Sequence, residues 1–149
     1  MTMHRKWKWL AIAPAILAGF LASACATTGG GLERSTGDKA LARYEPYLEE
    51  PVDSFTMLRH DSWEPINRNQ LVLYTTMNDA YLLTVMGPCY ELPFAQTVGV
   101  TTTGSSVTRF DSVIVRGNRC PITEIQPIDV HRMKADWRLR EAEEERTIA

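Results

Sequence analysis

The sequence has no apolar run long enough for an ordinary membrane-spanning helix. Its main uncharged, mostly apolar stretch covers residues 10–21 and contains a proline and a glycine, whereas a spanning helix needs about 20 predominantly apolar residues. A basic segment over residues 5–8 precedes the stretch, and small residues follow it at 22–24. This order predicts a secretory signal peptide over residues 1–24 in preference to a spanning anchor.

Positive charge is scarce after the predicted signal peptide. Residues 1–24 hold three of the 16 Lys and Arg side chains and none of the 18 Asp and Glu, so residues 25–149 carry a net charge of −5. Nucleic acids and anionic surfaces attract proteins through a positive field. The charge balance therefore disfavours both as the main partner, and we expect no nucleic-acid partner.

Cys25 directly follows the small residues, in the tetrapeptide Ala22-Ser23-Ala24-Cys25. The tetrapeptide resembles the bacterial lipobox, although Ala22 stands where a large aliphatic residue is usual. The resemblance implies a lipid on Cys25 and, with Ala26 next, an outer-membrane protein that faces the periplasm. The same small residues satisfy the A-x-A rule of the ordinary signal peptidase, so a soluble periplasmic protein is the alternative.

A polar, glycine-rich stretch follows Cys25 and contains too few apolar residues to order itself. We predict a flexible tether over residues 25–37, one globular β-rich domain over 38–137 and a charged helical tail over 138–149. The length after residue 24 suits one domain, and no internal repeat or second linker divides it.

Cysteine is scarce as well, and no C-x-x-C spacing occurs. If Cys25 carries lipid, Cys89 and Cys120 remain and are expected to form a disulfide, since the exported compartment is oxidising. Closing that loop stabilises a fold by about 3 to 4 kcal/mol in the chain-entropy model. A redox-active pair is the alternative, but it lacks the C-x-x-C spacing. His60 and His131 complete no zinc-ligand spacing with the cysteines, so we predict no metal site.

The domain is dominated by strand-like patterns. Residues 70–76 and 80–85 are rich in β-branched, aromatic and aliphatic residues, and the three residues 77–79 supply a turn between them. Further strands are predicted at 54–58, 98–103, 107–111, 112–116 and 120–125, with a second hairpin across residues 104–106. Sequential antiparallel pairing predicts a mainly β (α+β) fold, a small barrel or curved sheet of five to six strands.

One helix is predicted on each side of this sheet. Residues 38–45 contain good helix formers, and Pro46 is expected to end that helix. Asp129 is expected to cap a second helix, whose apolar face consists of Val130, Met133 and Trp137. Residues 138–146 are charged on all sides and predict a solvated helix, with a docking helix for a partner as the alternative.

Several short motifs between residues 40 and 130 follow one another in a characteristic order. They are Pro51-Val-Asp-Ser-Phe55, Trp63-Glu-Pro65, Ala80-Tyr-Leu-Leu83 with Pro88-Cys89, Phe110-Asp111, and Cys120-Pro-Ile-Thr-Glu-Ile-Gln-Pro-Ile-Asp129. In this order they resemble a domain-of-unknown-function family of small exported proteobacterial proteins, many of them lipoproteins. The resemblance implies export and paired cysteines, but no activity, ligand, cofactor or catalytic residue.

Two short segments contain residue types found in catalytic sites. His60-Asp61-Ser62 has the residue types of a hydrolase triad, but neighbours on an extended chain point to alternate faces and cannot converge. We interpret it as a polar turn. The hydroxyl-rich residues 101–106 lack the lysine and spacing of a phosphate-binding loop, so we interpret them as a hairpin.

Two scattered sets complete the candidates. Asp53, Asp111 and Glu124 would form an acidic cation site only if the fold gathered them, and we expect solvated or turn-capping carboxylates instead. The aromatic set is expected in the core and in strand pairs, not in a ligand box; it consists of Trp63, Tyr74, Tyr81 and Tyr90.

Three functional hypotheses remain, with no catalytic or cofactor-binding residue assigned. The preferred one is a non-catalytic lipoprotein, held to the membrane by its lipid, whose domain binds an envelope protein, a glycan or a lipid. The second is a structural or assembly role that uses the charged tail. The third is an enzyme whose site is assembled only in three dimensions, joining His60 or His131 to a carboxylate.

Overall fold

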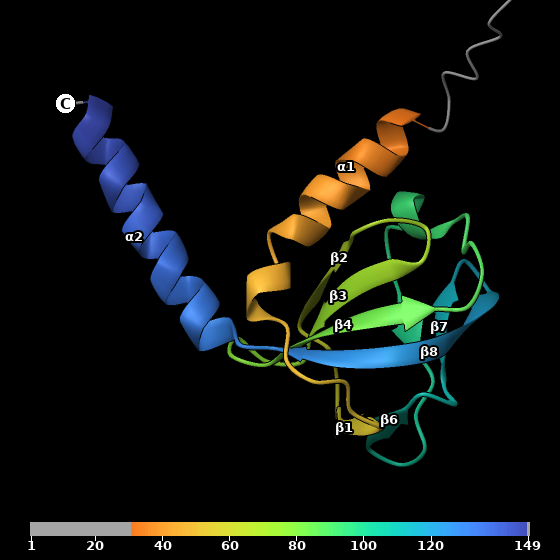
Figure 1. Cartoon of the computed structure of the whole chain (residues 1–149). Coiled ribbons are helices and arrows are strands. Elements are labelled where there is room, and N and C mark those ends of the chain that lie inside the picture. The colour runs from red at the N-terminus through yellow and green to blue at the C-terminus, as the bar shows by residue number, and fades with distance from the viewer. Residues whose placement is uncertain (1–30, 149) are drawn as a thin grey trace, which may run out of the picture.

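A computed structural model describes residues 31–148, with side chains from residue 36 onward (Figure 1). Residues 1–30, which include the predicted signal peptide and Cys25, lie outside the described residues. No helix in the described part of the chain is long and apolar enough to cross a membrane.

Six strands form one curved antiparallel sheet in the order β2-β3-β4-β8-β7-β5 (Figure 1). They are β2 (Ser62–Pro65), β3 (Gln70–Tyr74), β4 (Ala80–Val85), β5 (Gly99–Val100), β7 (Ser112–Val115) and β8 (Asn118–Ile128). A separate two-stranded sheet pairs β1 (Ser54–Thr56) with β6 (Ser106–Thr108). The predicted fold, a mainly β (α+β) domain with a curved antiparallel sheet between two helices, is confirmed.

The predicted hairpin of β3 and β4 is confirmed, with Gln70 opposite Thr84 and Tyr74 opposite Ala80. Its turn is closed by side chains of its own: the Thr76 hydroxyl donates to Asp79 Oδ2 over 2.6 Å. The Thr76 hydroxyl oxygen also accepts the backbone N–H groups of Asn78 and Asp79, both over 3.1 Å, which explains why residues 75–79 turn tightly.

The second predicted hairpin is wrong. β5 pairs with β7, and β6 pairs with β1, so the segments on either side of residues 104–106 join different sheets. Only an isolated bridge links Thr103 with Ser106. The physical reason lies further along the chain: the Asp111 carboxylate accepts hydrogen bonds from the hydroxyls of Thr101 and Thr108, which bends the chain between β6 and β7.

Sequential pairing also fails at the middle of the sheet, because β8 lies between β4 and β7. β8 is longer than the predicted 120–125. It pairs with β4 on one side and with β7 on the other, and these backbone hydrogen bonds stabilise the longer strand. β2 was not predicted; it begins at Ser62, the last residue of the segment interpreted as a polar turn, and Trp63 pairs with Leu73. Pro65 ends this strand at the sheet edge, where a missing N–H is tolerated.

The N-terminal helix, α1 (Gly31–Ala42), begins before the predicted Asp38 and includes residues 31–37, which sequence analysis placed in the tether. Gly37 permits its packing, because a Cβ there would lie 3.0 Å from Asn67 Cβ and 3.1 Å from the carbonyl oxygen of Ile66. Pro46 does not end α1. It is the second residue of the short 3₁₀ helix η1 (Glu45–Tyr47), where a proline is tolerated in the first turn.

The C-terminal helix, α2 (Val130–Ile148), begins as predicted. Asp129 Oδ1 accepts a hydrogen bond from the backbone N–H of Arg132 over 3.0 Å, so the predicted cap is confirmed. Val130 and Met133 are buried, whereas Trp137 is half-buried and meets the ring of Tyr44 edge-on at 6.3 Å.

Alternate residues of the strands divide the interior into two apolar clusters. Leu71 and Leu73 of β3 belong to the larger cluster, with Phe55 and Val107 of the small sheet and the 3₁₀ helix η2 (Leu92–Phe94). Val72 faces the other cluster, which η1 and the start of α2 cover. A disulfide joins Cys89, after β4, to Cys120 in β8, with their Cα atoms 6.0 Å apart.

Candidate binding groove

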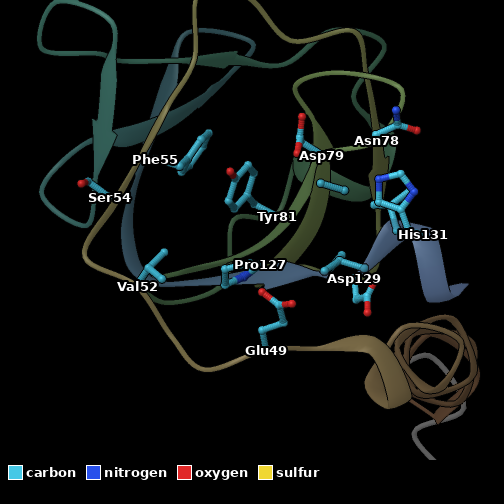
Figure 2. Close-up of a pocket in the computed structure, with 13 residues that line it drawn as sticks. Glu49, Val52, Ser54, Phe55, Asn78, Asp79, Tyr81, Pro127, Asp129 and His131 are labelled. Atoms are coloured by element: carbon cyan, nitrogen blue, oxygen red, sulfur yellow. The ribbon is translucent and has the colours of Figure 1, made fainter.

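A hollow of about 410 Å³ lies where three separate segments of the chain meet (Figure 2). Residues 49–55, the turn between β3 and β4, and the junction of β8 with α2 line it. We call this hollow the acidic groove, and define it by Glu49, Phe55, Asp79, Tyr81, Asp129 and His131. Its volume falls within the range of small-ligand and side-chain pockets.

Backbone hydrogen bonds hold the first segment in place beside β8. The N–H of Glu49 donates to the carbonyl oxygen of Pro127 and that of Val52 donates to Ile125, both over 2.9 Å. The N–H of Asp129 in turn donates to the carbonyl oxygen of Tyr47 over 2.8 Å. The groove is therefore built on paired backbone and not on free loops.

An aromatic pair forms one wall. The rings of Phe55 and Tyr81 are stacked, with centroids 4.0 Å apart and planes inclined by 17°. Phe55 is buried, whereas Tyr81 is half-buried. Figure 2 shows Tyr81 near the centre of the groove, between Phe55 on one side and His131 on the other. Among the described residues, the Tyr81 hydroxyl has no hydrogen-bond partner.

Three carboxylates surround this wall. The Asp79 carboxylate accepts a hydrogen bond from Thr76, and Asp129 caps α2, but the Glu49 carboxylate forms no hydrogen bond or ion pair within the described part of the chain. Burial raises the pKa of Tyr81, and the negative charges of Asp79 and Glu49 raise it further. The groove thus gathers three carboxylates, and the charges of two of them reach Tyr81.

A second hollow, of about 740 Å³, shares Asp79 and Tyr81 with the acidic groove. Exposed apolar side chains stand at its rim, with Leu58 exposed by 89% and Met77 by 75%. Tyr81 therefore separates an acidic hollow from a more apolar one.

The triad-like residues do not converge. The N–H of Asp61 donates to the carbonyl oxygen of Tyr74 over 2.8 Å, and Ser62 begins β2. No hydrogen bond joins the side chains of residues 60–62 where the structure describes them. His131 lines the acidic groove, whereas His60 is not among the residues that line it.

The three acidic candidates are separated as well. Asp53 forms an ion pair with Arg109 at 3.5 Å, Glu124 lies opposite Thr84 in the sheet, and Asp111 binds threonines. In residues 31–148, no three His, Cys, Asp or Glu side chains are grouped in a way that could hold a metal ion.

Asp111 is the buried carboxylate of the domain and has a structural role. Its Oδ2 accepts hydrogen bonds from the backbone N–H and hydroxyl of Thr108 (2.8 and 2.9 Å), and Oδ1 accepts from the Thr101 hydroxyl (2.9 Å). Burial opposes ionisation and on its own raises the pKa of Asp111, but these hydrogen bonds outweigh it and the pKa is lowered. The hydroxyl-rich segment therefore serves the fold.

The expectation for the aromatic set is confirmed for three residues and wrong for one. Trp63 and Tyr81 pack against the larger apolar cluster, and Tyr74 packs against the smaller one. Tyr90 is 63% exposed, with the guanidinium of Arg68 over its ring at 5.4 Å. Sequence reasoning did not single out Glu49, because nothing in its neighbourhood indicates that β4 and α2 will approach it.

A comparison with protein families identifies the relatives of this chain. The model of a family of unknown function (DUF6491) matches residues 8–144. The chain belongs to this family. The match of this DUF6491 protein includes the apolar segment, Cys25 and the whole β domain, and it confirms the resemblance to a domain-of-unknown-function family. No curated protein and no solved structure matches the chain.

Proposed function

We propose that this DUF6491 protein is an envelope lipoprotein, anchored through Cys25 in the outer membrane and facing the periplasm. Two features support the proposal: Cys25 directly follows a three-zone leader, and a disulfide joins Cys89 and Cys120, as suits an oxidising compartment. The three small residues before Cys25 also fit the ordinary signal peptidase, so a soluble periplasmic form is the alternative.

The β domain acts in this proposal as a non-catalytic binding module, and one observation carries that role. The acidic groove presents the Glu49 carboxylate and the Tyr81 hydroxyl without hydrogen-bond partners among the described residues, next to Asp79 and Asp129. Acceptors in a negative potential favour a ligand that brings donors and positive charge. The partner proposed is a segment of an envelope protein that presents a lysine or arginine side chain.

Intact-mass measurement of the mature protein tests the anchor. We expect the mass of a diacylglycerol and a further acyl chain on Cys25, together with a two-hydrogen deficit that reductant removes. A mature chain with a free thiol at Cys25 would show the soluble form instead.

Titration calorimetry with a short lysine peptide tests the groove. We expect the double variant Glu49→Gln, Asp79→Asn to weaken binding by roughly threefold to tenfold, because each exposed ion pair contributes up to about 1 kcal/mol. The matched double variant Glu141→Gln, Glu144→Gln removes the same charge from α2 and should bind as the native protein does. Binding of a neutral oligosaccharide, unaffected by salt, would assign the groove to glycans, and binding of neither probe contradicts the proposal.

A further inference from the structure

Three exposed apolar side chains are carried by the segment that follows β4. Met86 is 64% exposed, Tyr90 63% and Phe94 65%. The segment itself is firmly held, because Cys89 is in the disulfide and Leu92 is fully buried. A rigid segment that displays several large apolar groups together is typical of a contact surface.

Two arginine side chains contact this segment, one of them over an aromatic ring. The guanidinium of Arg68 lies 5.4 Å from the centre of the Tyr90 ring. Arg116, in the turn after β7, pairs with Glu91 over 3.0 Å and donates to the carbonyl oxygen of Phe94 over 3.4 Å. We call Arg68, Met86, Tyr90, Phe94 and Arg116 the arginine-aromatic surface.

Contacts along the chain place this surface near the middle of α1. Gly37 of α1 packs on Asn67 in the turn before β3, and the carbonyl oxygen of the next residue, Arg68, accepts the N–H of Cys89 over 2.8 Å. Figure 1 shows the N-terminal end of α1 and η2 at the same end of the molecule, with β1 and β6 at the other.

The anchor cannot be far from this end. Six residue steps separate Cys25 from Gly31, the first residue of α1. A fully extended chain spans at most about 3.6 Å per residue, so they reach no more than about 20 Å. From Gly31 to Gly37 the helix rises only about 9 Å. A lipid on Cys25 would thus hold this end of the domain close to the bilayer.

We infer that the arginine-aromatic surface rests on the lipid bilayer in which Cys25 is anchored. Aromatic and aliphatic groups enter the boundary between head groups and acyl chains, while arginines remain at the phosphates. The acidic groove, at the opposite ends of β4 and β8, is then turned toward the periplasm. This inference rests on the proposed lipid anchor and adds the orientation of the domain.

Two matched tryptophan variants of the acylated protein test the contact. Phe94→Trp places a reporter in the surface, and Phe110→Trp places one at the opposite end of β7, where Phe110 is also exposed and lies under an arginine, Arg109, at 5.5 Å. Both variants share the background of Trp63 and Trp137. The proteins are reconstituted in phosphatidylcholine vesicles with brominated acyl chains, with and without phosphatidylglycerol.

We expect the emission of Phe94→Trp to shift to the blue and to be quenched beyond the shared background, and more strongly with phosphatidylglycerol. The emission of Phe110→Trp should equal that in vesicles without bromine. Equal quenching at the two positions, or none at residue 94, would overturn the inference while leaving the anchor in place. Absence of acyl mass on Cys25 would instead remove the proposed anchor, and this inference with it.

Discussion

The stacked rings of Phe55 and Tyr81 join the two-stranded sheet to the six-stranded one. Phe55 lies in β1 and Tyr81 in β4, two strands that share no backbone pairing, yet the ring centroids are 4.0 Å apart. The pair closes the larger apolar cluster and at the same time forms the wall of the acidic groove. Stability and the proposed binding site therefore depend on the same contact.

Replacing Phe55 by alanine should lower the free energy of unfolding by about 3 kcal/mol, because a buried aromatic ring is lost and the small sheet loses its main apolar contact. Urea unfolding followed by circular dichroism measures the change. The matched variant Tyr81→Phe keeps the stack and removes a hydroxyl that bonds no described residue, so its stability should stay within about 0.5 kcal/mol of the native value. Equal losses for both variants would show that the stack is not the stabilising contact.

Removal of the disulfide should cost about 3 to 4 kcal/mol of unfolding free energy, because the unfolded chain regains the freedom of the loop between Cys89 and Cys120. The double variant Cys89→Ala, Cys120→Ala, studied by thermal and denaturant unfolding, measures this loss. Reductant should destabilise the native protein and leave the double variant unchanged. A native protein that is insensitive to reductant contradicts the prediction.

Asp111 should make stability depend on pH in the acid range. Because its pKa is lower in the folded state than the ordinary value of 3.8, its contribution is present above that pH and is lost as the pH falls through the folded pKa. The variant Asp111→Asn should lose about 2 kcal/mol at neutral pH, since an amide NH₂ cannot accept the threonine hydrogen bonds, and its stability should fall less steeply on acidification. Asp53→Asn, at an exposed ion pair, is the control and should change stability by less than about 1 kcal/mol.

Tyr44 should contribute to a loss of stability in alkaline solution. Burial raises its pKa, and hydrogen bonds with Glu64 (2.5 Å) and Tyr74 (3.3 Å) raise it further. The unfolded tyrosine ionises near pH 10 while the folded one stays protonated, so stability should decline as the pH rises above about 10. Tyr44→Phe should decline less and lose about 1 to 2 kcal/mol at neutral pH. Tyr90→Phe, at an exposed ring, should behave like the native protein in both respects.

The features predicted correctly are those whose signals lie within a few residues. The hairpin of β3 and β4 follows from two apolar segments and the turn residues between them, and the start of α2 follows from a cap and one apolar face. The pairing of Cys89 with Cys120 was expected because few cysteines leave few choices. Local propensity and elimination are sufficient in each case.

The features missed depend on partners far away in the chain. The segment 106–108 has the pattern of a hairpin strand but pairs with β1, because Asp111 and the threonines redirect the chain after it. α1 begins at Gly31, ahead of the predicted start, and its Gly37 packs against the turn before β3, about 30 residues further along the chain. Neither contact has a signal in its own neighbourhood.

By itself, the sequence of this DUF6491 protein determined the order of basic, apolar and small residues before Cys25, and the mainly β domain with its capped C-terminal helix, because each is encoded by adjacent residues. Only the tertiary structure decided which strands pair and where an acidic groove and an arginine-aromatic surface form. The acidic groove joins segments between residues 49 and 131, and the arginine-aromatic surface joins segments between residues 68 and 116. Their side chains meet only when long-range packing compensates the entropy of closing those loops.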